Sequence, residues 1–366
     1  MGSELNPVVP AKDMWLNSGL IGANSYCVLS DGEEYAASFL EEDVDAIFRS
    51  GSEKHFVRLI GKKDKNEVWF VPFGGSSRNV ERFAEIVDKV QSELLGMKGF
   101  IFPFDLISTR DYSVYKFGDL ISGYVVFPYD RSKYYPIRKA LMVSDAPRWA
   151  LSLSLFRRLR ELHSLGLALN GFSREQVRVE KGTNEVVLCL NEYTTMLDQF
   201  NAKHRLNSFL AIPDATEAKV REAGKRLSGN TRDIFSAAVL SFYLLHYSHP
   251  FIGNAFGSVI RQQYLTFYQN KPTYLFDPEG NNAPNNLQYG VEIRRQWQRT
   301  VPELKKLYSE LFLAVSHPER FSWDEGAAEW MSIDRWIACL EKDAAANDNE
   351  LSLSHYPFES ERLHQV

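Results

Sequence analysis

The sequence from Leu169 to Val177, LNGFSREQV, is the stretch that decides the fold. It follows a segment that begins near Arg148 and carries leucines at helical spacing. It precedes two short strand-like runs, the second of which begins at Val186. A polar loop between a helix and a strand pair is a usual place for a catalytic centre, because such loops present side chains from a rigid scaffold. The rest of the chain is therefore interpreted around residues 148–195.

Composition bounds the classes of function. The 366 residues suffice for two domains or lobes, and a net charge of −5 with a pI near 6.0 gives no basic surface for nucleic acid. Cys27, Cys189 and Cys339 are far apart, which favours buried thiols in a reducing compartment and no metal site. No signal peptide is visible, and the longest apolar run, 237–247, is shorter than the roughly 20 residues that cross a bilayer. We expect a cytoplasmic protein that binds neither nucleic acid nor membrane.

The first part of the chain reads as a small antiparallel sheet with one helix. Apolar faces at helical spacing predict the helix at 79–95, and Gly96 is a stop signal behind it. The helix and the strand-like runs together predict an N-terminal lobe over residues 1–128. Alternating or apolar runs that indicate strands occur at 25–29, 56–60, 68–73, 100–107 and 122–128.

After Pro128 the pattern becomes mostly helical, which predicts a second lobe over 129–341 and a polar tail at 342–366. The run 233–247 is nearly all apolar and predicts a buried helix. Further helices are expected at 134–143, behind Pro147, and at 258–268, 301–315 and 333–340, with a long loop at 271–290.

Several short motifs occur in one order along the chain, and their order resembles that of bacterial serine/threonine protein-kinase-like proteins. The resemblance covers residues 56–341 and implies an α+β, bilobal protein-kinase-like fold. The alternative is an unrelated α+β protein. The motifs are Leu159–Leu167 (LRELHSLGL), Asp233–Ser236 (DIFS), His249–Phe251 (HPF), Tyr274–Pro278 (YLFDP) and Ser332–Trp336 (SIDRW).

The resemblance also implies where catalytic groups should stand, and there the acids are missing. Gly171 occupies the position of the catalytic base, Gln176 that of a magnesium-binding asparagine, and Asn191 that of the metal-binding aspartate. A neutral amide is a weaker ligand than a carboxylate for a hard dication. A shift of one residue would instead place Glu192 at the metal position, and Glu175 is a second nearby acid.

The ATP-binding lysine implied by the resemblance is also missing. If the run 68–73 is the strand that should carry it, no lysine is present there. If the run 56–60 is that strand, the basic residue is Arg58, whose planar fork is a poor substitute for a lysine ammonium. Its partner on the following helix would be Glu81 or Glu85.

Loss at several separated positions predicts a degenerate member of that family, a pseudokinase without cofactors. We expect it to act as a scaffold or allosteric regulator that binds a protein, such as an active kinase or phosphatase. Two alternatives stay open, and either would allow weak ATP or Mg²⁺ binding. One is an enzyme with a rearranged site built on Glu175, Glu192 and Asp198 that transfers a phosphoryl or nucleotidyl group. The other is a sensor that binds nucleotide without hydrolysing it.

Overall fold

The structure is a computed structural model, and its chain divides into two compact units. The first unit comprises 1–132 with 188–194, and the second comprises 133–187 with 195–366. Each is described by itself. The described residues are 26–28, 34–39, 57–61, 67–72, 78–94, 97–108, 122–126, 133–137, 148–183, 185–191, 193–197, 208–287, 290–324 and 326–347.

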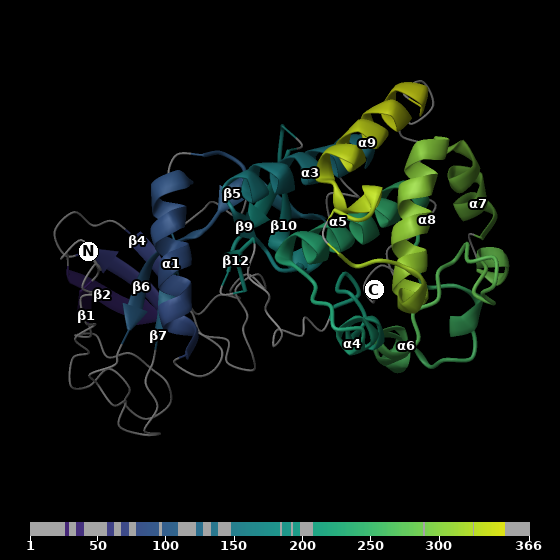
Figure 1. Cartoon of the computed structure of the whole chain (residues 1–366). Coiled ribbons are helices and arrows are strands. Elements are labelled where there is room, and N and C mark those ends of the chain that lie inside the picture. Colours follow the sequence, from purple (N-terminus) through teal and green to yellow (C-terminus); the bar gives the residue numbers. More distant parts are fainter. Residues whose placement is uncertain are drawn as a thin grey trace. The chain divides into compact units, whose positions relative to one another are not determined.

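The first unit contains an antiparallel sheet of six strands, in the order β1-β2-β3-β4-β7-β6 (Figure 1). Strands β1 to β4 are neighbours in the sheet in the order in which they occur along the chain, whereas β7 lies between β4 and β6. The ladder between β6 and β7 is irregular between Pro103 and Asp105. The strands span Tyr26–Val28 (β1), Glu34–Phe39 (β2), Val57–Gly61 (β3), Glu67–Pro72 (β4), Pro103–Ser108 (β6) and Ser122–Val126 (β7).

Helix α1, Arg78–Glu93, connects β4 to the next strands and packs against β6. Its buried side chains include Ile86, Val87 and Val90, whereas Glu85 is exposed. Burial therefore follows the helical period read from the sequence, which is why this helix could be predicted almost to its ends.

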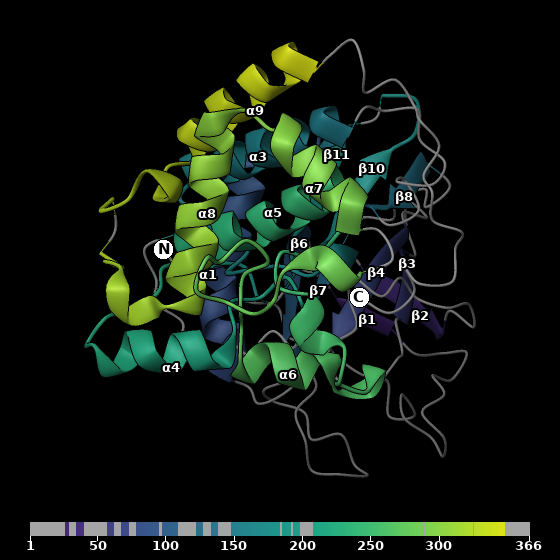
Figure 2. The ribbon, with the colours of Figure 1, turned by 90° about the vertical axis from the view of Figure 1, so that its right-hand side faces the viewer.

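The second unit is mostly helical and is built around α5, Gly229–His246. Almost every residue of α5 is buried, as an apolar helix requires, and Ser228 caps its start by accepting a hydrogen bond from the Thr231 amide at 3.2 Å. Helices α3 and α8 pack against it (Figure 2). The other helices are α3 (Arg148–Ser164), α4 (Asp214–Glu222), α6 (Tyr264–Asn270), α7 (Gly290–Arg299), α8 (Pro302–Ser316) and α9 (Ile333–Asn347).

Short strands flank the loop that follows α3. Strand β9 (Leu167–Ala168) pairs with β12 (Thr195–Met196), and β10 (Val177–Glu180) pairs with β8 (Tyr134–Pro136), both antiparallel. Strand β11 (Val186–Cys189) follows β10. Its last two residues belong to the first unit, where they pair in parallel with β5 (Phe100–Ile101). The predicted strand pair after the loop is thus confirmed.

Several predicted boundaries are wrong. Residues 134–136 form strand β8 and not the start of a helix, because their backbone pairs with β10. Helix α6 begins at Tyr264, six residues later than predicted, after a short 3-10 turn. The run 100–107 is divided between β5 and β6, and α9 extends past 341 to Asn347. Helices α4 and α7 were not predicted.

Among the described residues, no helix has the length and apolar character needed to span a bilayer.

Candidate functional site

The loop after β9 is held in place by a buried carboxylate from α5. Asp233 Oδ1 accepts a hydrogen bond from the Gly171 amide at 2.7 Å, and Oδ2 accepts one from the Leu169 amide at 2.8 Å. His163 Nε2 lies 3.0 Å from Oδ2. The Asp233 side chain is 0% exposed, and a buried carboxylate needs polar partners of this kind, of which it has three. The loop is therefore fixed to α5 by its own backbone.

The loop reaches this position through a turn with unusual backbone angles. Asn170 has φ 62° and Gly171 has φ 78°, which places both in the left-handed region. Glycine suits that region because it has no Cβ. The next amide along the loop, that of Phe172, donates a hydrogen bond to Ser236 Oγ of α5 at 3.3 Å. The same hydroxyl donates to the Leu210 carbonyl at 2.8 Å. Successive loop amides are thus turned towards α5.

The position expected to carry the catalytic base has no proton acceptor, since Gly171 has no side chain. Gln176, at the position expected for a metal ligand, is buried, and its Oε1 accepts a hydrogen bond from the Ser173 amide at 3.1 Å. The Gln176 amide in turn donates to the Ser173 carbonyl at 3.1 Å, which closes the short turn Arg174–Gln176. The side-chain oxygen of Gln176 therefore stabilises its own loop.

Asn191 belongs to the first unit, where it follows β11. Its Oδ1 accepts the Tyr193 amide at 3.1 Å, and its own amide donates to Thr194 Oγ1 at 3.2 Å. The Thr194 amide also donates to the Asn191 carbonyl at 2.9 Å. This is an Asx-type turn, in which the side-chain oxygen replaces a backbone acceptor. Asn191, like Gln176, thus has a structural role in its own loop.

The other predicted site residues are only partly placed. Glu192 and Asp198 lie outside the described residues. Glu175 lies in the turn before β10 and Arg58 in β3, but their side chains lie outside what the structure describes, as does that of Glu81 in α1. Within the described part of the chain, no group of three or more His, Cys, Asp or Glu side chains is placed to hold a metal ion.

A partly buried ion pair that sequence reasoning missed supports the same loop. Arg232, the neighbour of Asp233, lies 3.1 Å from Glu217 of α4 and donates from Nη1 to Asn170 Oδ1 at 3.0 Å. Burial raises the pKa of the Glu217 carboxyl, and the adjacent Arg232 guanidinium opposes that rise. An arginine in the first turn of a nearly all-apolar helix was the only sequence feature that could have indicated this pair.

The comparisons give one similarity to a kinase. No family model matches the chain. Over 166 residues it is 24% identical to the 4-diphosphocytidyl-2-C-methyl-D-erythritol kinase of Sulfurimonas denitrificans, a match that covers 44% of this chain and 61% of that kinase. The named substrate of that relative is a small molecule. The comparison therefore shows similarity to a kinase, without the serine/threonine protein-kinase-like relationship predicted from the motifs.

Proposed function

We propose that this chain is a degenerate, protein-kinase-like protein that transfers no phosphoryl group and acts by binding a protein partner as a scaffold or allosteric regulator. The observation that carries the proposal is the use of the expected catalytic positions for loop structure. Gly171 offers only its amide, to Asp233, and the side-chain oxygens of Gln176 and Asn191 accept backbone amides. Groups that hold their own turns together are poorly available to a metal or a proton.

The order of the parts supports the kinase-like element of the proposal. A small sheet with one helix comes first, and a mostly helical unit follows, which is the order of parts in the protein-kinase fold. In the second unit the buried aspartate of α5 holds the loop that resembles the catalytic loop. A loop scaffold without its acids is what a fold retained for binding would keep.

The direct test is a phosphotransfer assay with ATP and Mg²⁺, which measures autophosphorylation and transfer to a generic protein substrate. Wild type, Glu175→Ala and Asn191→Ala are compared, with Glu185→Ala as a control, because Glu185 is an exposed acid. We expect no turnover from any of the four. Turnover by the wild type that Glu175→Ala or Asn191→Ala reduces, and Glu185→Ala does not, would contradict the proposal.

Nucleotide binding is tested separately by thermal shift with ATP, with and without Mg²⁺ or Mn²⁺. A ligand at 100 times its Kd stabilises the native state by about 2.7 kcal/mol, which raises the Tm by several degrees. We expect no shift at millimolar ATP. A metal-independent shift without turnover would favour a nucleotide sensor, and a metal-dependent shift would favour a rearranged active site.

A second candidate function is phosphoryl transfer to a small molecule, which the 24% identity to a small-molecule kinase favours. The match spans only 61% of that relative, so its activity is a proposal for this chain. The assay above therefore includes 4-diphosphocytidyl-2-C-methyl-D-erythritol as acceptor. ATP-dependent phosphorylation of that compound would replace the first proposal with the second.

A further inference from the structure

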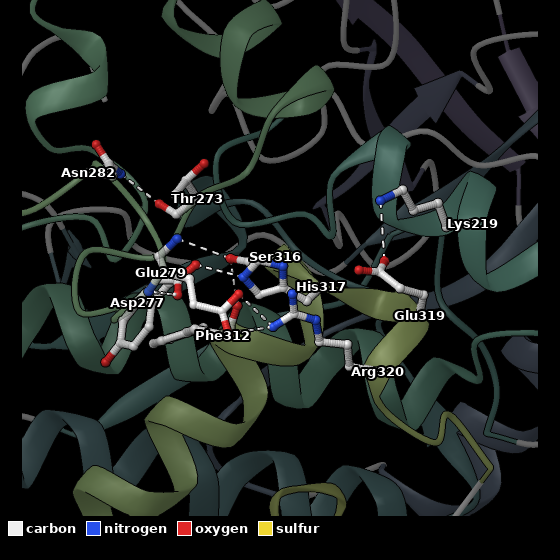
Figure 3. Close-up of polar contacts among 11 residues, drawn as sticks. Lys219, Thr273, Asp277, Glu279, Asn282, Phe312, Ser316, His317, Glu319 and Arg320 are labelled. Atoms are coloured by element: carbon white, nitrogen blue, oxygen red, sulfur yellow. Dashed lines mark hydrogen bonds and ion pairs between the residues drawn. The ribbon is translucent and has the colours of Figure 1, made fainter.

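A hollow of about 230 Å³ lies in the second unit, between α4, the turn after α6 and the end of α8. Figure 3 shows five of the side chains that line it, Lys219, Thr273, Asp277, Ser316 and His317. The hollow shares no residue with the loop held by Asp233. Most of its polar lining consists of hydroxyl groups and basic or imidazole side chains. These residues are Thr216, Lys219, Lys271, Thr273, Ser316 and His317.

Hydrogen bonds fix the walls of this hollow. Thr216 Oγ1 of α4 donates to the Val315 carbonyl of α8 at 2.8 Å. The Tyr274 amide donates to Ser316 Oγ at 3.0 Å, which joins the turn after α6 to the end of α8. Asn282 is fully buried and donates to the Thr273 carbonyl at 2.6 Å. Since each wall is tied to a neighbour, the space between them is preorganised rather than an effect of loose packing.

His317 is oriented by a buried carboxylate. Its Nε2 lies 2.7 Å from Asp277 Oδ2, and the Asp277 side chain is 2% exposed. The other carboxylate oxygen accepts the Glu279 amide at 3.0 Å. Both Asp277 oxygens are thus occupied, and the imidazole is held in one orientation. Among the described residues, no partner contacts His317 Nδ1, which leaves this nitrogen for a ligand.

Two lysines supply positive charge at the hollow. Lys271 is exposed, and its ammonium makes no hydrogen bond or ion pair with any residue that the structure describes. Lys219 lies 3.3 Å from Glu319, with both side chains more than half exposed at 54% and 55%. Exposed pairs of this kind contribute about 0–1 kcal/mol, so Lys219 can leave Glu319 for a stronger partner at little cost.

We propose that this hollow binds the phosphate group of a small phosphate monoester or of a phosphorylated side chain. Ammonium groups bind phosphate as point charges, and the Thr273 hydroxyl in the lining is a further donor. An imidazole that carries both of its protons also donates through Nδ1. The volume sets the size of the ligand: about 230 Å³ lies below the roughly 300–1,000 Å³ of pockets that enclose a whole drug-sized molecule. The hollow therefore takes one anionic group with its attachment point, and the rest of a larger ligand would stay outside it. This inference is independent of the proposed function.

The test is isothermal titration calorimetry of the full chain with phosphoserine at constant ionic strength. Wild type is compared with Lys271→Met, Lys219→Met and a matched control, Lys225→Met. Lys225 is also an exposed lysine in an ion pair, with Asp324, but it does not line the hollow. We expect saturable binding by the wild type and by Lys225→Met, and roughly tenfold weaker binding by each of the other two variants, the usual effect of losing one charge-assisted hydrogen bond. All three changes are at exposed lysines, so each variant should fold.

A second arm identifies the source of the phosphate. A short peptide that contains phosphoserine is titrated beside the free amino acid and beside the unphosphorylated peptide. Equal affinity for the peptide and for phosphoserine indicates a free metabolite, and tenfold tighter binding of the phosphorylated peptide indicates a protein ligand. Two outcomes would overturn the proposal: no saturable binding up to about 20 mM, which would saturate a millimolar site, or an equal loss in Lys225→Met.

Discussion

The Asp233 carboxylate accepts a hydrogen bond from the Gly171 amide at 2.7 Å, although the two residues are 62 positions apart. This contact and its companion at Leu169 hold the loop after β9 onto α5. The shape of the loop therefore depends on the carboxylate that α5 presents to it.

Asp233→Asn should destabilise the protein by about 2–4 kcal/mol, because an amide group then faces backbone N–H donors that need an acceptor. Asp334→Asn is the matched control, since Asp334 is 73% exposed and makes only a surface pair with Arg160. Urea unfolding of both variants measures the difference. A loss at Asp233 no larger than that at Asp334 would mean that the loop does not depend on this carboxylate.

Gly171→Ala should cost about 1–2 kcal/mol, the penalty of a left-handed backbone for a residue with a Cβ. No clash adds to it, because the nearest atoms to the new Cβ, on Arg232 and Ser236, would be 3.6 Å away. Gly182→Ala is the control: φ there is 88° and nothing lies within 4 Å. We expect similar changes in the free energy of unfolding for the two variants. A much larger loss at Gly171 would show that the loop has less room than its geometry indicates.

Glu217 should make stability fall as pH rises through the range just above its ordinary pKa of 4.5. Burial raises the pKa of this carboxyl, so the folded state holds its proton at a pH where the unfolded chain has lost it. The contribution of Glu217 to the free energy of unfolding is then highest below pH 4.5 and decreases until the folded group has ionised. The difference between wild type and Glu217→Gln, measured by urea unfolding from pH 4 to pH 7, isolates this contribution. A difference that rises with pH would contradict the prediction.

His249 should make the protein labile to acid. Burial lowers its pKa from 6.5 to about 4, and that of His246 to about 3. The unfolded chain binds a proton at each site below about 6.5 and the folded chain does not, so stability is fully present above 6.5 and is lost as pH falls towards 4. At about 1.4 kcal/mol per unit, His249 alone can contribute about 3 kcal/mol. His249→Asn should flatten the dependence between pH 7 and pH 5, and an unchanged slope would refute it.

The sequence by itself determined the elements whose character is local. Helix α1 and helix α8 follow from apolar residues at helical spacing, and α5 follows from a run that is apolar on all sides. The absence of a side chain at position 171 is also a fact of sequence. These features could be predicted because each depends on residues within a few turns of one another.

The tertiary structure decided what those elements do together. The pairing of β8 with β10, the sheet order that places β7 beside β4, and the ion pair of Arg232 with Glu217 all join distant residues. The use of Gln176 and Asn191 oxygens by their own turns depends on local backbone angles that residue type alone does not specify. The hollow beside His317 exists only because three segments distant in sequence meet there and are joined by hydrogen bonds. Periodicity determines which face of an element is apolar, and packing determines which polar groups are left to meet.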